Sequence, residues 1–138
     1  MRFLKNQKVE VCSKEEGFAG SFYEATILNP LYINGNEVFY KVEYKNLLEE
    51  NETEPLVENV PQNEIRPLPP PLSNESGFSV NELVDVFAND GWWFGRITGK
   101  RGSYFSVYFP TTCDHIEYHV SLLRPHQDWV EQKWISYK

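Results

Sequence analysis

This sequence of 138 residues is poor in the residues that build disulfide frameworks and metal sites, with only two cysteines and three histidines. Cys12 and Cys113 lie far apart, without the close spacing typical of a metal site, so a reduced intracellular protein is expected. No apolar run approaches the roughly 20 residues of a membrane span, and no signal peptide precedes Arg2. We therefore expect a soluble protein that has no membrane partner.

The sequence also lacks the motifs of catalytic and cofactor sites. It has no nucleophile elbow, no glycine-rich phosphate loop and no zinc-ligand spacing. His115, His119 and His126 lie near acidic residues and could form a metal or acid–base cluster, but the first half of the chain has no histidine. We expect a protein that is not an enzyme and that uses no metal or cofactor.

Positive charge is scarce, because 13 basic residues face 20 acidic ones, which gives a net charge of −7. An acidic protein repels phosphate backbones and favours cationic partners. Small barrels with aromatic faces can stack bases, but that mode needs a basic groove, and Lys100-Arg101 is the only adjacent basic pair. Charge thus argues against a nucleic-acid partner. An equally simple interpretation is that the acids keep the protein soluble.

The chain contains an internal repeat of about 60 to 70 residues per copy. Each copy is near the lower size limit for independent folding, so we expect two small domains that pack together, residues 1–72 and residues 73–138. The matching segments are Phe3–Val11 with Phe78–Val86, Ser21–Ile27 with Gly91–Ile97, Phe39–Tyr44 with Tyr104–Phe109, and Glu64–Pro67 with Leu122–Pro125.

Both copies show short stretches of alternating apolar and polar residues and no sustained helical period. This pattern predicts an all-β fold of two tandem SH3-like, five-stranded barrels. Residues 46–61 are rich in glutamate and are expected to form a mobile acidic loop. Pro67 to Pro71 are expected to form a stiff polyproline II linker, and the tail with Trp129 and Trp134 a strap on the barrels.

Three consecutive aromatic residues, Trp92-Trp93-Phe94, follow a turn signal at Asp90-Gly91. Because side chains alternate between the faces of a strand, at least one of these rings must face outward. A methylated lysine keeps its positive charge but loses hydrogen-bond donors, and the faces of aromatic rings attract such a cation. The aromatic stretch therefore predicts recognition of a cationic, methylated peptide.

The order of these motifs resembles a tandem pair of Agenet domains of the Tudor-like Royal superfamily. The shared pattern is Val-acid-Val, then Phe22-Tyr23 or Trp92-Trp93, then an aromatic strand and Arg-Pro. Leu123–Val130 resembles the end of a plant Agenet module, and Cys113-Asp114 resembles the tandem Agenet region of the fragile X family.

The resemblance implies a nuclear chromatin reader that binds a methylated histone tail. Its similarity to plant heterochromatin proteins implies histone H3, dimethylated in an Ala-Arg-Lys-Ser context. Because the barrels are small, joined by a stiff linker and divergent in sequence, we expect both to act as one unit. An RNA-binding or general protein-interaction module is the alternative.

The resemblance also implies a cage with one ring at the end of the first strand, one at the start of the second and one at the end of the third. These positions hold Phe87, Trp93 and Phe109 in the second copy, whereas the first copy has Cys12 at one of them. Barrel core is the alternative interpretation of these rings. The candidate cage residues are Phe22, Tyr23, Tyr44, Phe87, Trp92, Trp93 and Phe109, and the candidate acidic peptide-binding residues are Glu15, Glu16, Asp90, Asp114 and Glu117.

Overall fold

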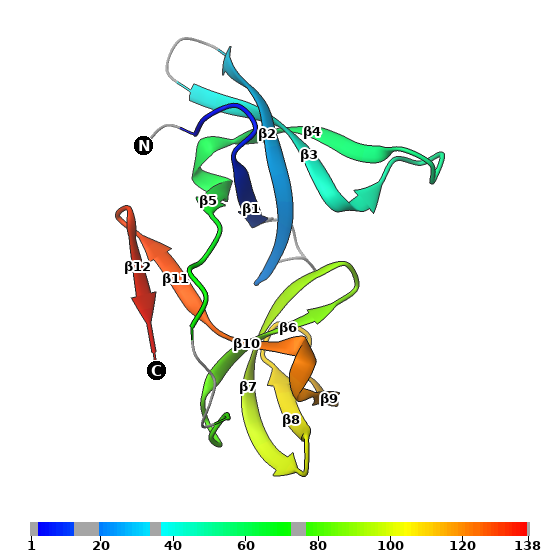
Figure 1. The fold of residues 1–138 in the computed structure, drawn as a ribbon, viewed down its shortest axis with the longest axis vertical. Coiled ribbons are helices and arrows are strands. Elements are labelled where there is room, and N and C mark those ends of the chain that lie inside the picture. Colours follow the sequence, from blue (N-terminus) through cyan, green and yellow to red (C-terminus); the bar gives the residue numbers. More distant parts are fainter. Residues whose placement is uncertain (1–2, 13–19, 34–36, 73–76, 138) are drawn as a thin grey trace. The chain divides into compact units, whose positions relative to one another are not determined.

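The computed structural model describes residues 3–12, 20–33, 37–72 and 77–137, which are mostly β-strand. The all-β expectation is therefore confirmed. Contacts divide the chain into two compact units, one built mainly from Phe22–Leu68 and the other from Pro69–Lys138 (Figure 1). The described ranges contain no helix that is long and apolar enough to cross a membrane.

The first unit is an antiparallel sheet in the order β5-β1-β2-β3-β4. A short 3-10 turn, η1, joins its last two strands. The elements are β1 (Lys8–Cys12), β2 (Ser21–Ile33), β3 (Glu37–Leu48), β4 (Pro55–Pro61), η1 (Gln62–Glu64) and β5 (Ile65–Pro67).

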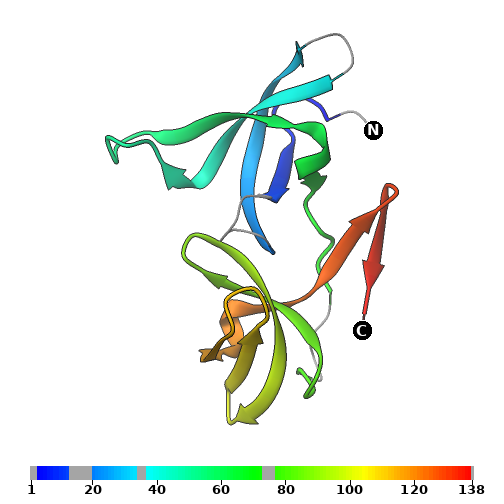
Figure 2. The ribbon, with the colours of Figure 1, turned by 180° about the vertical axis from the view of Figure 1, so that it is seen from behind.

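The second unit repeats this plan in the order β10-β6-β7-β8-β9. The hairpin of β11 and β12 forms a separate two-stranded sheet, shown in orange to red in Figure 2. The elements are β6 (Leu83–Ala88), β7 (Gly91–Arg101), β8 (Tyr104–Phe109), β9 (Asp114–His119), η2 (Val120–Leu122), β10 (Leu123–Pro125), β11 (Gln127–Val130) and β12 (Lys133–Ser136).

Each unit therefore has the five strands expected from the sequence. Among the described strands, β4 pairs only with β3, and β9 pairs only with β8. Pairing of the fourth strand with the fifth would close a barrel, but this pairing is not among those of the described strands. Barrel closure therefore remains a prediction.

The expectation of a mobile acidic loop at residues 46–61 is wrong for most of that segment. Strand β3 continues to Leu48, which pairs with Pro55 at the start of β4. Between them, the N–H of Glu49 donates to the carbonyl of Glu54 at 2.8 Å, and the Asn51 side chain accepts from the N–H of Thr53 at 3.0 Å. The backbone pairing satisfies its own hydrogen bonds while most of the carboxylates remain on the solvent side, so acidic composition did not prevent strand formation.

Most of the expected polyproline linker, from Pro69 to Pro71, belongs to the second unit. The Gln127 side chain donates from Nε2 to the carbonyl of Pro70 at 2.9 Å, and Gln127 is buried. The contacts thus separate the units after Leu68, whereas the sequence suggested a division after residue 72.

The core of the second unit follows from the alternation of side chains along its strands. Val84, Val86, Ile97 and Val107 are fully buried together, so the residues between them point to the other face of the sheet. A two-residue turn at Asn89-Asp90, with φ of 50° and 67°, joins β6 to β7. Asparagine and aspartate tolerate this left-handed conformation, and the turn fixes the register that directs the β7 rings.

Gly95 permits a close approach between β7 and β8. A Cβ atom at Gly95 would lie 2.4 Å from Cγ1 of Val107 and 3.1 Å from the carbonyl oxygen of Tyr108. The expected result of Gly95→Ala is a loss of about 1 to 3 kcal/mol in the free energy of unfolding, because the core must shift. The matched control is Gly99→Ala, whose Cβ would meet Ser106 only at 3.8 Å. Urea denaturation of both variants measures the difference, and equal midpoints would contradict the prediction.

Candidate functional site

A pocket of about 150 Å³ lies in the second unit, between the β6–β7 turn and strands β7, β8 and β9. Its walls combine three aromatic rings with one carboxylate. The lining residues are Ala88, Asn89, Trp93, Phe109, Thr112, Asp114, Ile116 and Tyr118.

Trp93 forms one wall, and both its backbone position and its indole ring are fixed by contacts with β6. Trp93 lies directly opposite Val86 of β6, so its side chain is on the core-facing side of the sheet. Its indole Nε1 donates to the carbonyl of Ala88 at 2.8 Å. This hydrogen bond fixes the ring orientation beside the turn, which leaves an aromatic face available to the pocket.

Phe109 and Tyr118 form the second and third aromatic walls. Their ring centroids lie 5.9 Å apart with an interplanar angle of 87°, an edge-to-face arrangement. Phe109 is only 7% exposed and belongs to the core. Burial and then the charge of Asp114 raise the pKa of the Tyr118 hydroxyl, so Tyr118 stays neutral at physiological pH.

This arrangement is suited to a cation. Aromatic faces attract ammonium groups most strongly where water is displaced, and Asp114 adds a negative charge to the same pocket. Nothing in the lining set is a nucleophile activated by an adjacent base, as covalent catalysis requires.

The structure brings together only two of the three ring positions expected in the second copy. Trp93 and Phe109 line the pocket, but Phe87 contacts Trp92 on the opposite face, with ring centroids 5.2 Å apart. The reason is alternation, since Val84 and Val86 face the core and Phe87 is out of phase with them. Trp92 in turn lies under the guanidinium of Arg124, at 4.2 Å.

Tyr118 is the pocket ring that the sequence did not identify. It lies on β9 directly opposite Phe105, a core residue of β8. The signal was present in the sequence, because Ile116, Tyr118 and Val120 alternate with polar residues. Only the order of the strands shows that this alternating face lies beside Phe109.

In the first copy, Tyr23 and Tyr44 occupy the positions of Trp93 and Phe109. They are only 8% and 6% exposed, and Val60 stands where the second copy has Tyr118. Burial raises the pKa of Tyr44 well above its usual value, with further contributions from Glu58, Glu64 and Tyr23. These two tyrosines are thus largely core.

The remaining first-copy candidate, Phe22, lies on the other face of β2. The guanidinium of Arg66 stacks over its ring at 3.6 Å. Phe22 and Trp92 therefore play the same part in the two copies, because Phe22 contacts the buried Arg66 and Trp92 contacts the partly buried Arg124.

The acidic candidates are dispersed. Asp114 lines the pocket, and Asp90 lies at the tip of the β6–β7 turn. Glu117 instead binds Arg101 on the outer face of the sheet, and this hydrogen bond lowers the pKa of its carboxyl. Glu15 and Glu16 lie outside the described residues.

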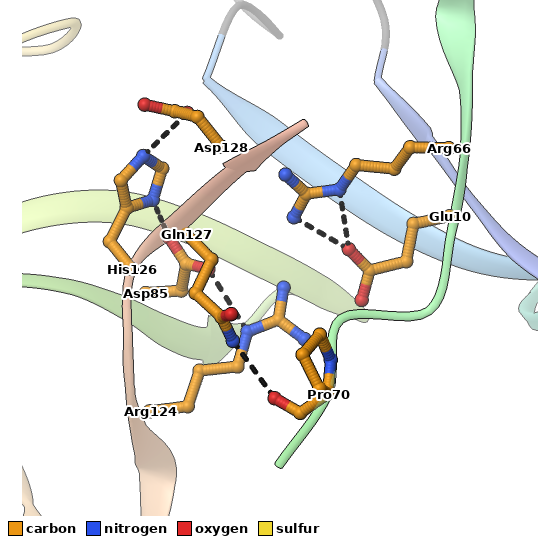
Figure 3. Close-up of polar contacts among 8 residues, drawn as sticks. All are labelled: Glu10, Arg66, Pro70, Asp85, Arg124, His126, Gln127 and Asp128. Carbon is orange, nitrogen blue, oxygen red and sulfur yellow. Dashed lines mark hydrogen bonds and ion pairs between the residues drawn. The ribbon is translucent and has the colours of Figure 1, made fainter. Parts of the chain in front are cut away.

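Buried ion pairs join the first and last strands of both units (Figure 3). Glu10 accepts from Nη2 of Arg66 at 2.7 Å and from its Nε at 3.1 Å. In the second unit, Asp85 accepts from Nε of Arg124 at 2.9 Å. Val-acid-Val and Arg-Pro, the motifs that define the repeat, are the two sides of this pair.

His126 extends the network of the second unit. Its Nδ1 lies 2.7 Å from Asp85, and its Nε2 lies 2.9 Å from Asp128 (Figure 3). His115 and His119 lie on β9, apart from this network in sequence and contacts. Among the described residues, no group of three or more His, Cys, Asp or Glu side chains is arranged to hold a metal ion.

A second, larger depression of about 320 Å³ is lined by Pro69 to Leu72, Trp92 and the β10 strand. Prolines dominate its wall, and no carboxylate lines it. This depression therefore has fewer groups that attract a cation than the pocket of Trp93, Phe109 and Tyr118 has.

The chain is similar to known Agenet proteins over nearly its whole length. The Agenet domain family model matches residues 6–70. Protein AGENET DOMAIN (AGD)-CONTAINING P1 of Arabidopsis thaliana is 38% identical over 130 residues, which are 93% of this chain and 24% of that protein. The chain thus spans about a quarter of the length of this curated relative.

Two solved structures share the fold. The crystal structure of Arabidopsis thaliana AGDP1 AGD34 superposes with a TM-score of 0.85 and 33% identity, covering 96% of this chain and 88% of that one. The crystal structure of ADCP1 tandem Agenet domain 3-4 gives a TM-score of 0.81 and 29% identity, with 96% and 86% covered.

Loss of the Asp85 carboxylate should be costly. Asp85→Ala leaves Arg124 and His126 without their shared buried acceptor, so we expect a loss of about 3 to 5 kcal/mol in the free energy of unfolding. Glu24→Ala is the control, because its partner Lys45 is 62% exposed and a pair open to solvent on one side should contribute at most about 1 kcal/mol. Chemical denaturation measures both, and a similar small loss in the two variants would contradict this prediction.

Proposed function

This chain belongs to the Agenet domain family, and we propose that it is a chromatin reader whose second copy binds a methylated lysine of a histone tail. The observation that carries the proposal is the pocket formed by Trp93, Phe109 and Tyr118 with Asp114 beside it. The protein acts as a binding module and not as an enzyme.

The chemistry of the pocket favours a methylated ammonium over an unmodified one. An unmodified lysine presents three N–H donors that need hydrogen-bond partners, and three of the walls are aromatic rings. Methyl groups replace those donors and contact the ring faces, while the positive charge remains. The cation–π attraction is then gained at a smaller cost in lost hydration.

Asp114 supports dimethyl-lysine as the preferred state. A dimethylammonium retains one N–H, which a carboxylate can accept in a charge-assisted hydrogen bond, whereas a trimethylammonium has none. We therefore favour dimethyl-lysine, and from the family resemblance the Ala-Arg-Lys-Ser context of histone H3 and a nuclear location. Positively charged flanking residues of such a tail are complementary to a chain with a net charge of −7.

The first test removes a pocket wall. Trp93→Ala should weaken binding of an H3 peptide dimethylated in this context by about 1 to 3 kcal/mol, because cation–π attraction and buried ring area are both lost. Trp93→Phe should recover part of the affinity, since it restores a ring. Isothermal titration calorimetry measures the change.

The control for this test is Trp129→Ala, which removes a ring of the same size from β11, where it contacts Trp134 and not the pocket. It should bind the peptide as the unsubstituted protein does. Equal affinities of a folded Trp93→Ala variant and the original protein would show that the methylated lysine lies elsewhere.

The second test addresses methylation state. Asp114→Asn keeps the side-chain shape but removes the charge, so affinity for the dimethyl peptide should fall by more than affinity for the trimethyl peptide. Loss of one charge-assisted hydrogen bond corresponds to roughly 1.5 to 3 kcal/mol. A parallel titration of both peptides compares the two losses, and an equal loss for both would disprove the assigned hydrogen bond.

A further inference from the structure

The outer face of β7, β8 and β9 has the opposite charge character to the rest of the chain. These three strands carry three basic residues, Arg96, Lys100 and Arg101, against two acidic ones, Asp114 and Glu117. Their formal charge is therefore 3 − 2 = +1, although the whole chain carries −7. Asp114 and Lys100 lie opposite the core residues Phe109 and Phe105, so neither belongs to the outer face. The outer face therefore carries Arg96 and Arg101 against Glu117, which is again a formal charge of +1.

Two cross-strand rows of side chains define this surface. Arg96, Tyr108 and His115 lie opposite one another on β7, β8 and β9. The guanidinium of Arg96 lies 6.0 Å from the Tyr108 ring centroid, and the Tyr108 and His115 rings meet edge to face at 6.3 Å. The row thus combines a cation with two stackable rings.

The second row has the same composition. Arg101, Tyr104 and His119 lie opposite one another, with Arg101 at 5.6 Å from the Tyr104 ring and the Tyr104 and His119 centroids 5.2 Å apart. Tyr104 is 43% exposed. The tyrosines are four residues apart on one strand, or about 13 Å.

The first copy shows that this surface is not a requirement of the fold. At the positions of Arg96, Tyr108 and His115 it has Thr26, Glu43 and Val57 in the same register. The same sheet thus forms without the cationic and aromatic row, which argues for a role other than stability.

We propose that this outer face, Arg96, Arg101, Tyr104, Tyr108, His115 and His119, binds single-stranded nucleic acid. Exposed rings on a sheet stack bases whatever their sequence, and arginines beside them contact phosphates. An acidic peptide would use the arginines but not the row of rings. The net charge of −7 disfavours nucleic acid for the chain as a whole. The acidic and basic side chains are not evenly distributed, however, and this face carries a net positive charge.

Glu117 limits the affinity of this surface. It holds Nη2 of Arg101 at 2.5 Å, and the Arg101 side chain is nevertheless 74% exposed. An exposed pair of this kind is weak, so a phosphate replaces the carboxylate at little cost. The surface shares no residue with the pocket, and this inference is independent of the proposed function.

Fluorescence anisotropy with labelled single-stranded RNA and DNA oligonucleotides of about twelve nucleotides tests the proposal at low salt on the full chain. Tyr104→Ala and Tyr108→Ala should each weaken binding about tenfold. Arg96→Gln and Arg101→Gln should each reduce the slope of log affinity against log salt by about 0.7. Glu117→Gln should strengthen binding, because it removes the competing carboxylate.

Matched controls come from the first copy. Phe39→Ala removes the ring at the position of Tyr104, and Lys41→Gln removes an exposed cation from the corresponding strand; both should bind the oligonucleotides as the original chain does. If an alanine variant fails to fold by circular dichroism, the two arginine variants and Glu117→Gln decide the matter.

Three results would overturn the proposal: no binding of either oligonucleotide, equal affinity in the folded ring or arginine variants, or full displacement of the oligonucleotide by an equal concentration of an acidic peptide. The last result would identify the surface as an acidic-peptide site. Binding of RNA alone or DNA alone would support the proposal and assign the type of strand.

Discussion

A buried acid–arginine pair between the first and last strand is the constraint on which each unit depends. Glu10 with Arg66, and Asp85 with Arg124, occupy the same register in the two sheets. Either partner alone would leave an uncompensated buried charge, and a one-residue slip would move every side chain to the other face. The pair therefore fixes which rings of the next strand face the core.

The sequence was sufficient for the repeat, the strand class and the family, because these depend on local alternation and on motif order. It was insufficient where a residue's face depends on strand order or on a distant partner. Phe87 looked like a cage wall until Val84 and Val86 fixed the parity of β6. Tyr118 is adjacent to Phe109 only through β8–β9 pairing, and Arg124 covers Trp92 only after the last strand returns.

The two copies share a backbone plan but differ in how they fill its core. The first has Ala25, Tyr23 and Val60, all buried, where the second has Gly95, Trp93 and Tyr118. The missing Cβ of Gly95 lets β8 approach closely, while the indole and phenol rings stand at the edge of the core and not in its centre. The second copy thus exchanges part of its packing for a lined pocket.

Strand β8 shows how one small sheet can serve two chemistries. Its buried residues, Phe105, Val107 and Phe109, continue the core toward the aromatic pocket, whereas Tyr104 and Tyr108 point to the outer face. Alternation keeps the negative and aromatic pocket apart from the positive and aromatic surface without any extra element. Because the two proposed sites lie on opposite faces of β8, a substitution that alters the charge of one face leaves the charge of the other unchanged.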